Sequence, residues 1–395
     1  MAPADARSEQ WRSRRARRLA GLGWVRREDR ADGTPVRFVA DELLVLDDHF
    51  ATARQAFLEQ GFTVRDIVEE GDVPDGFRRV RLPGLDVARA ARRVRVQAEA
   101  AGDGRVAAGP NHVFVSTPFE HAGPYGPPRP VAPGSLTVRD RAVPEVEVLV
   151  LDTGVWLNSP LPKDRYVTDD FESDLQHDDA GTDDGVRDGD VGHANFVAGV
   201  LLTRSEHVRP RVMKIVDTHG VCRESDLIAG LGQAYDHQII NLSLGGYTLD
   251  DRPPLLLTAA LARLLGTGDR VVVAAAGNDG QHDRPFWPAA YAGTSVPWRR
   301  RVIAVAAHDG RRISDWSNTG TWITLAAPGA DVTSTFVHHE GFDDGWATWS
   351  GTSFAAPFVA AAIADALPGA GSARLAAEAV IAGAARRYGR YAGLA

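Results

Sequence analysis

The sequence predicts an α/β fold with a mainly parallel β-sheet, preceded by a small α+β domain. Runs of β-branched and aliphatic residues at 146–151 and 271–276 are typical of buried parallel strands. Apolar runs rich in small residues at 194–202 and 354–367 are typical of close-packed helices. The length of 395 residues leaves room for two domains, and 44% hydrophobic with 24% charged residues is an ordinary globular composition.

The part of the chain before these runs divides into three segments. Residues 1–34 are basic, and we expect them to form a solvated tail. Residues 35–117 show the ferredoxin-like βαββαβ order. Residues 118–143 are rich in proline and glycine and predict an extended, exposed linker. The six elements predicted in the second segment are residues 36–46, 49–60, 62–68, 77–82, 85–101 and 112–116.

A serine stands at the start of the last long apolar run. Gly351 allows a tight turn before Ser353, and Pro357 is tolerated early in a helix. A serine there exposes its hydroxyl beside free backbone amides, which is the setting that stabilises a developing oxyanion. An ordinary N-cap is the alternative interpretation of this residue.

Three further polar residues adjoin the apolar runs. Asp152 ends the first strand-like run, at the edge where parallel α/β sheets place their chemistry. His193 precedes the first helix-like run, where an aspartate across the crevice is able to hold its ring. Asn278 follows the second strand-like run and is placed to donate to an oxyanion. A plain turn is the alternative there, because asparagine and glycine dominate turns.

With these motifs the chain resembles the subtilisin-like serine peptidases, or subtilases. The Asp-Thr-Gly at 152–154 resembles their aspartate motif, and Gly-His at 192–193 their histidine motif. Residues 351–357 resemble their serine motif, and residues 274–280 the segment with their oxyanion asparagine. The order Asp, His, Ser is that of subtilisin. For residues 144–395 the resemblance implies a subtilisin-like three-layer fold with a mainly parallel sheet.

The resemblance also implies a serine endopeptidase that works through an acyl-enzyme intermediate and needs no metal or cofactor. It implies Ser353 as the nucleophile, His193 as the base and Asp152 as the residue that orients the imidazole. The Asn278 side chain and the Ser353 backbone amide are implied as the oxyanion hole.

The residues beside these motifs depart from the family pattern. Ala-Asn-Phe at 194–196 stands where Gly-Thr-His is usual, and Phe354 and Phe358 replace Met and His. The departures leave a non-catalytic, peptide-binding subtilase scaffold as the alternative function.

Substrate contacts are also implied by the resemblance. Two edge segments are expected to pair with an extended peptide. Phe286 falls near the base of the first specificity pocket, where it would favour a small P1 side chain. The edge segments consist of Ser243, Leu244, Gly245, Gly246, Ala275, Ala276 and Gly277.

The N-terminal domain resembles the propeptide that subtilases often carry. Such a domain assists folding and covers the active site until it is cleaved, so the chain's own domain is implied as an intramolecular inhibitor. Self-processing in the linker follows as an expectation, since cleavage concentrates in exposed linkers. The alternatives are a domain that stays attached as a regulator and an unrelated α+β domain that recruits a partner.

An acidic loop at 169–190 precedes His193 and allows three interpretations. Charge runs are usually solvated, but its carboxylates are also suited to a cation such as calcium or to basic substrate residues. His177 within it is an alternative base that lacks a following helix pattern.

Composition excludes several other classes. The net charge of −8 argues against a general nucleic-acid binder, and no run approaches 18 consecutive apolar residues, so we expect no membrane partner. The single cysteine, Cys222, excludes an internal disulfide; we expect it in a turn with no catalytic role. The first residues do not form a convincing signal peptide, so we expect a cytoplasmic protein that acts on proteins or peptides.

Overall fold

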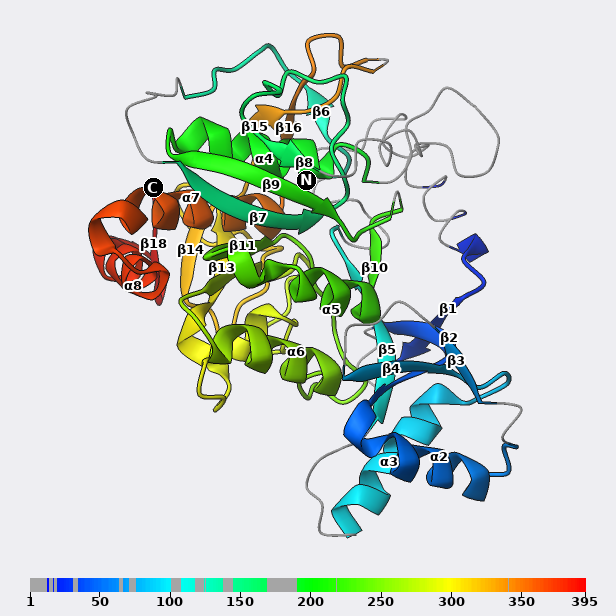
Figure 1. Cartoon of the computed structure of the whole chain (residues 1–395). Helices are drawn as coiled ribbons and strands as arrows, with labels where there is room; N and C mark the ends of the chain where they lie inside the picture. The colour runs from blue at the N-terminus through cyan, green and yellow to red at the C-terminus, as the bar shows by residue number, and fades with distance from the viewer. Residues whose placement is uncertain are drawn as a thin grey trace.

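The computed structural model describes residues 13, 17, 20–30, 35–63, 67–70, 76–100, 108–117, 124, 126–137, 145–168, 190–217, 219–339 and 341–395. His177, the rest of the acidic loop up to residue 189, and linker residues 118–123, 125 and 138–143 lie outside this description. The described chain forms a large α/β part with a smaller α+β part beside it (Figure 1).

A sheet that has nine strands over the described residues forms the centre of the large part. Its strand order is β17-β18-β14-β13-β12-β11-β7-β9-β8, and the pairs from β18 to β8 are parallel. The predicted mainly parallel sheet is therefore confirmed. The strands are β7 (Val146–Asp152), β8 (Val167–Thr168), β9 (Val208–Lys214), β11 (Ile239–Leu242), β12 (Val271–Ala275), β13 (Val302–His308), β14 (Leu325–Pro328), β17 (Arg386–Tyr388) and β18 (Tyr391–Gly393).

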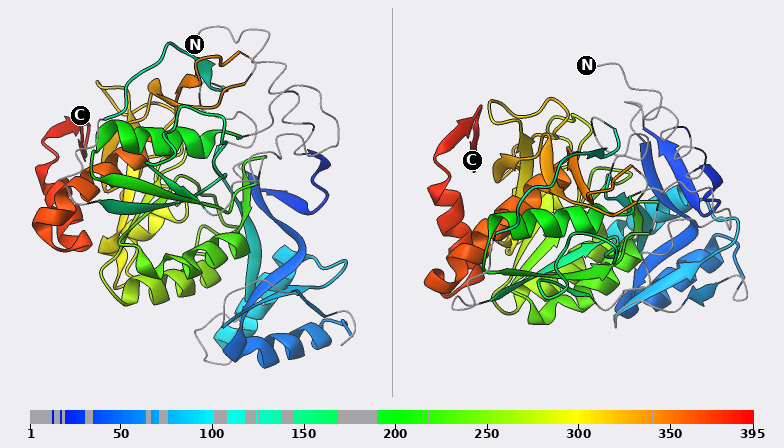
Figure 2. Two further views of the ribbon diagram at one scale, coloured as in Figure 1. Left: turned by 45° about the horizontal axis from the view of Figure 1, so that its top comes forward. Right: turned by 90° about the horizontal axis from the view of Figure 1, so that it is seen from above.

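Helices pack on both faces of this sheet and give three layers (Figure 2). Successive side chains of a strand point to opposite faces, and β7 supplies both cores in this way. Its Val148 and Val150 join a core cluster with helices α4, α7 and α8, whereas Leu149 and Leu151 join one with α5 and α6. The helices are α4 (His193–Arg204), α5 (Glu224–Gly232), α6 (Leu255–Gly266), α7 (Thr352–Ala370) and α8 (Ala373–Gly383), with 3₁₀ turns at Asp47–His49, Ala234–Asp236, Ala289–Gly293 and Arg299–Arg301.

Helix α7 is the most apolar helix of this arrangement. Its 19 residues, with a mean hydropathy of 1.4, are long and apolar enough to cross a membrane by length and composition alone. However, 67% of this stretch is buried inside the protein, in the core cluster that includes Ala355, Val359 and Ile363. Packing against the central sheet therefore accounts for its hydropathy.

The smaller part follows the predicted βαββαβ order. Its strands are antiparallel and lie in the order β5-β2-β4-β3. A separate three-stranded sheet, β15-β16-β6, lies beside the large part. The elements are β2 (Pro35–Leu46), α2 (Phe50–Glu59), β3 (Val68–Glu70), β4 (Phe77–Arg81), α3 (Val87–Ala100), β5 (Ala108–Val115), β6 (Arg129–Pro130), β15 (Val332–Thr335) and β16 (Trp346–Trp349).

Two strands of the smaller sheet were not predicted. β1 (Val25–Asp29) lies in the segment expected to be a tail and pairs antiparallel with β2. β10 (Val221–Arg223) belongs to the large part but pairs antiparallel with β5, so Cys222 lies in a buried strand and not in a turn. Neither strand has an alternating apolar pattern. Each is formed by backbone pairing with a neighbouring strand, which leaves no such pattern in the sequence.

We predict that Gly199→Ala destabilises the protein. A Cβ atom at residue 199 of α4 would lie 2.1 Å from Thr335 Oγ1 and 2.9 Å from the Thr335 backbone nitrogen. Overpacking of this kind lowers the free energy of unfolding by about 1–3 kcal/mol. Denaturant unfolding followed by circular dichroism measures the change. Gly266→Ala at the end of α6 is the matched control, because nothing lies within 4 Å of its added Cβ; equal losses in both variants would contradict the prediction.

Candidate active site

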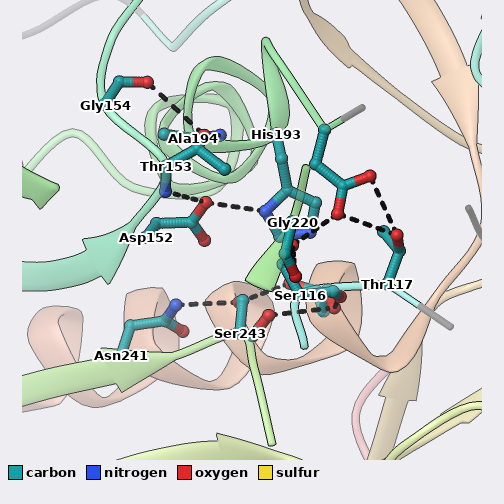
Figure 3. A network of polar contacts seen from close by, with 12 residues as sticks. Ser116, Thr117, Asp152, Thr153, Gly154, His193, Ala194, Gly220, Asn241 and Ser243 are labelled. Atoms are coloured by element: carbon teal, nitrogen blue, oxygen red, sulfur yellow. Dashed lines mark hydrogen bonds and ion pairs between the residues drawn. The ribbon is translucent and has the colours of Figure 1, made fainter. Parts of the chain in front are cut away.

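Asp152 and His193 face each other at the carboxyl edge of the central sheet. Asp152 is the last residue of β7, and His193 is the first residue of α4. The His193 Nδ1 atom lies 2.7 Å from Asp152 Oδ1, and both side chains are fully buried (Figure 3). The Thr153 backbone amide also donates to this oxygen, at 2.7 Å. The carboxylate therefore fixes the imidazole with Nδ1 toward Asp152 and Nε2 away from it.

The backbone before His193 requires glycine. Gly192 has φ +90°, and a Cβ there would lie 2.6 Å from the Phe336 ring. The rings of Trp349 and Phe354 lie 5.6 and 5.4 Å from that of His193, centroid to centroid. This aromatic surrounding excludes water from the Asp152–His193 pair and strengthens the interaction between the two side chains.

The side chains that depart from the family pattern are held by specific contacts. Asn195 Oδ1 accepts a hydrogen bond from the Trp156 amide at 2.8 Å, and Asn195 Nδ2 donates to the Trp156 carbonyl at 2.9 Å. These two bonds tie α4 to the loop that follows Asp152. The Phe196 ring lies 4.3 Å from that of Phe354, and Phe358 lies under the Arg204 guanidinium at 4.0 Å.

Ser353 lies in the first turn of α7, and only 2% of its surface is exposed. Its hydroxyl donates to the carbonyl oxygens of Ser116, at 2.9 Å, and Ser243, at 3.2 Å. Over the described residues, the Ser353 hydroxyl makes no hydrogen bond to His193. The Ser243 hydroxyl donates in turn to the Ser353 carbonyl at 2.7 Å. The residues that directly follow β5 and β11 therefore meet the first turn of α7 at one point.

The Asn278 side chain is oriented by the residue before Ser353. Its Oδ1 accepts from the backbone amide of Thr352 at 2.8 Å and from the Thr352 hydroxyl at 3.0 Å. The Gly277 amide donates to the same hydroxyl at 3.0 Å. With Oδ1 engaged, Nδ2 is the end of the carboxamide that is left to donate. Sequence reasoning did not single out Thr352, although it lies within the serine motif.

The first predicted edge segment pairs with the chain's own N-terminal domain. Val115 and Gly245 exchange backbone hydrogen bonds at 2.8 and 2.9 Å, which is an antiparallel bridge. The Ser116 amide donates to the Gly220 carbonyl at 3.1 Å. On its other side Gly246 exchanges two backbone hydrogen bonds with Trp287. The end of β5 and the two residues that follow it, Ser116 and Thr117, therefore fill the groove beside Ser353.

A small cavity remains between this strand and the second predicted edge segment. Its volume of about 20 Å³ is close to that of one water molecule. Phe286 lies at the cavity, near the position expected for it, and Gly277 lines it too. Ala276 is instead tied into the sheet through Val305. The lining residues are Val115, Ser116, Thr117, Leu244, Ala275, Gly277, Asn278, Asp279, Phe286, Thr352 and Ser353.

Asp190 belongs to the site, although the sequence placed it in an acidic loop. The expectation of a solvated charge is wrong for this residue, because it is fully buried. Its carboxylate accepts hydrogen bonds from the side chains of Ser116 and Thr117. Its carbonyl accepts the His193 amide at 2.8 Å. The feature of the sequence that could have identified Asp190 as a site residue is its position three residues before His193.

A buried polar cluster joins the N-terminal domain to α5. Asn111 Nδ2 donates to Glu42 Oε2 at 2.9 Å and to Ser225 Oγ at 3.1 Å. His112 Nδ1 lies 2.8 Å from Glu224 Oε2. Unpaired polar groups in such a place are costly, so these contacts fix how the two parts fit together.

Cys222 is a buried free thiol. Burial, with the nearby charges of Asp226 and Asp217, raises the pKa of its thiol well above the usual value. Over the part of the chain that the structure describes, no group of three His, Cys, Asp or Glu side chains is arranged to hold a metal ion.

Comparison with known proteins gives consistent matches. Residues 144–380 match the family model described as the subtilase family. A thermophilic serine proteinase of Bacillus sp. (strain AK1) is 32% identical over 54% of this chain and 50% of its own length. An intracellular serine protease of Paenibacillus polymyxa is 32% identical over 55% of this chain and 65% of its own length. The chain thus spans half to two thirds of these relatives.

A solved structure supports the same fold. A cold-adapted subtilisin-like serine proteinase superposes with a TM-score of 0.50 and 21% identity, over 67% of this chain and 91% of its own. The subtilisin-like three-layer fold is therefore confirmed.

We predict that Asn195→Ala destabilises the protein, because it removes both hydrogen bonds to the buried Trp156 backbone. The expected loss of unfolding free energy is about 2–4 kcal/mol. Thr203→Val is the control on the same helix, since the Thr203 hydroxyl bonds only an intrahelical carbonyl of Gly199. Denaturant unfolding compares the two, and a loss in Asn195→Ala no larger than in Thr203→Val would show that these bonds do not hold the loop.

Proposed function

Because this chain belongs to the subtilase family, we propose that it is a serine endopeptidase that hydrolyses proteins or peptides through Asp152, His193 and Ser353. The buried Asp152–His193 pair at 2.7 Å carries this proposal, because it orients an imidazole beside helix α7, whose first turn holds Ser353. The full set of side chains needed for acyl transfer lies at one edge of the sheet, which favours an enzyme over an inert scaffold.

The proposed reaction gives each of these groups a distinct role. The Ser353 hydroxyl turns from the Ser116 carbonyl toward His193, transfers its proton to Nε2 and attacks the peptide carbonyl carbon. His193 then protonates the leaving amine, so that the C–N bond breaks and an acyl-enzyme remains. Water repeats the sequence and releases the acid. Asp152 keeps the imidazole in one tautomer and stabilises its charged form.

Negative charge on the attacked oxygen needs donors that are already in place. We assign this role to Asn278 Nδ2 and the backbone amide of Ser353. The contacts of Thr352 to Asn278 Oδ1 support it, because they hold the carboxamide with its amine end available. The first turn of α7 adds the positive end of a helix dipole.

The N-terminal domain is proposed as an intramolecular inhibitor. Its β5 strand pairs with Gly245 as an extended peptide would, and the Ser116 carbonyl holds the Ser353 hydroxyl. A segment tethered to its own site acts at a high effective concentration. Because the Ser116 carbonyl is the one beside Ser353, we propose Ser116–Thr117, just before the linker at residues 118–143, as the bond for self-processing.

We also propose a cytoplasmic location. The single cysteine and the match to an intracellular serine protease support it, although another relative in the comparison is a minor extracellular protease of Bacillus subtilis. Fractionation of cells that express the untagged chain tests this; recovery in the medium would contradict it.

A fluorophosphonate probe tests the peptidase proposal directly. We expect covalent labelling of the full chain that disappears in Ser353→Ala and in His193→Ala. Asn278→Ala should lower turnover about 10²–10³-fold, the loss found for the oxyanion asparagine of subtilisin itself. Ser350→Ala, three residues from the nucleophile, is the control and should label normally. Absence of labelling in the wild type and in Ser350→Ala would favour the scaffold.

Intact mass over time tests self-processing. We expect the wild type to release a fragment that ends at Ser116, whereas Ser353→Ala stays at full length. A fragment that ends elsewhere in the linker would refute the assigned bond. A wild type that labels with the probe yet stays intact would mean that the domain inhibits without being cut.

A further inference from the structure

Asp190 makes the closest side-chain contacts to the peptide segment that fills the groove. Its Oδ2 accepts from Ser116 Oγ at 2.5 Å, and Thr117 Oγ1 lies 2.8 Å from both Oδ1 and Oδ2. One carboxylate thus accepts hydrogen bonds from the hydroxyls of two consecutive residues. Hydrogen bonds to a charged acceptor are roughly twice as strong as neutral ones.

The geometry of this contact admits only short side chains. Each hydroxyl oxygen is the first atom beyond Cβ, and it already lies at hydrogen-bonding distance from the carboxylate. A lysine or arginine side chain would have to pass through the space that the carboxylate occupies. The contacts of Asp190 therefore favour hydroxyl side chains over basic ones at these two positions.

The backbone of Gly220 approaches the Asp190 carboxylate so closely that no side chain fits there. Gly220 has φ +78°, and a Cβ there would lie 2.0 Å from Asp190 Oδ2. The Gly220 carbonyl also holds the Ser116 amide at 3.1 Å. The peptide backbone and the carboxylate are thus fixed relative to each other, and the Ser116 side chain lies between them.

Burial makes this contact selective. Asp190 is fully buried, so an alanine or valine in place of the two residues would remove these hydrogen bonds without giving water in exchange. Sites built to bond a hydroxyl reject analogues that lack it far more strongly than apolar pockets reject a missing methyl group.

From these contacts we infer that Asp190 is a specificity-determining residue that selects peptides with serine or threonine at the positions of Ser116 and Thr117. The inference rests on the proposed peptidase function and names the class of substrate for the same site. It also explains how the chain's own segment is recognised, since that segment carries the preferred pair of residues.

The test compares cleavage by the full-length wild type with Asp190→Asn and Asp164→Asn. Asp164 is an exposed carboxylate of the same domain, so Asp164→Asn controls for the lost charge. Each protein is incubated with a library of proteome-derived peptides, and mass spectrometry identifies the cut bonds. For the wild type and Asp164→Asn we expect serine and threonine to be enriched about tenfold at the two residues that flank the cut. In Asp190→Asn the enrichment should fall to about twofold or less.

A second measurement follows the chain's own segment and needs no added peptide. The double variant Ser116→Ala/Thr117→Val removes both hydroxyls and adds no bulk. Its Ser353 should react with a fluorophosphonate about tenfold faster than in the wild type, because the segment leaves the groove more often. Adding Asp190→Asn to this variant should change the labelling rate little, since the two hydroxyls that Asp190 binds are already absent.

The outcomes separate the two ideas. Labelling at Ser353 with no hydroxyl enrichment, or with equal labelling rates in the wild type and the double variant, would overturn the role of Asp190 and leave the peptidase intact. Enrichment that persists in Asp190→Asn would assign the selection to another residue. No labelling and no cleavage in any variant would remove the peptidase proposal and this inference together.

Discussion

The parallel pairing of β7, β11 and β12 is the constraint on which the site depends. Parallel strands end at the same edge of a sheet, so Asp152 at the end of β7 comes together with Ser243 and Asn278, which follow β11 and β12, although the three residues are far apart in sequence. Helices α4 and α7 begin at this edge and bring His193 and Ser353 to it. A shift of one residue in the pairing would turn Val148 and Val150 to the wrong core, so burial of the strands also fixes the site.

The N-terminal domain uses the same edge as an attachment surface. β10 leaves the central part to pair with β5, and the buried contacts of Asn111 and His112 with α5 align the strand that enters the groove. The bridge between Val115 and Gly245 continues this pairing up to Ser353. Release of the segment therefore requires the loss of backbone pairing and of buried polar contacts, which makes the covered state stable.

The replacements around the site act as one packing unit. Phe196 and Phe354 stand at departures from the family pattern, and each is the other's neighbour at 4.3 Å, with His193 and Trp349 against them. Considered one at a time in the sequence, these replacements raise doubt about the geometry of the triad. In the structure they fill one volume around the imidazole. A buried site tolerates such combined changes when they keep its total volume.

The sequence by itself determined the mainly parallel sheet, the βαββαβ order, and the places of Asp152, His193, Asn278 and Ser353, because each depends on local pattern or on a short motif. Only the tertiary structure decided that residues 113–117 lie in the groove, that β1 and β10 complete the smaller sheet, and that Asp190 is buried against two hydroxyls. A carboxylate within an acidic run has the same sequence signal whether it is solvated or buried. Its partners come from more than 70 residues away, and contacts between distant segments leave no local pattern in the chain.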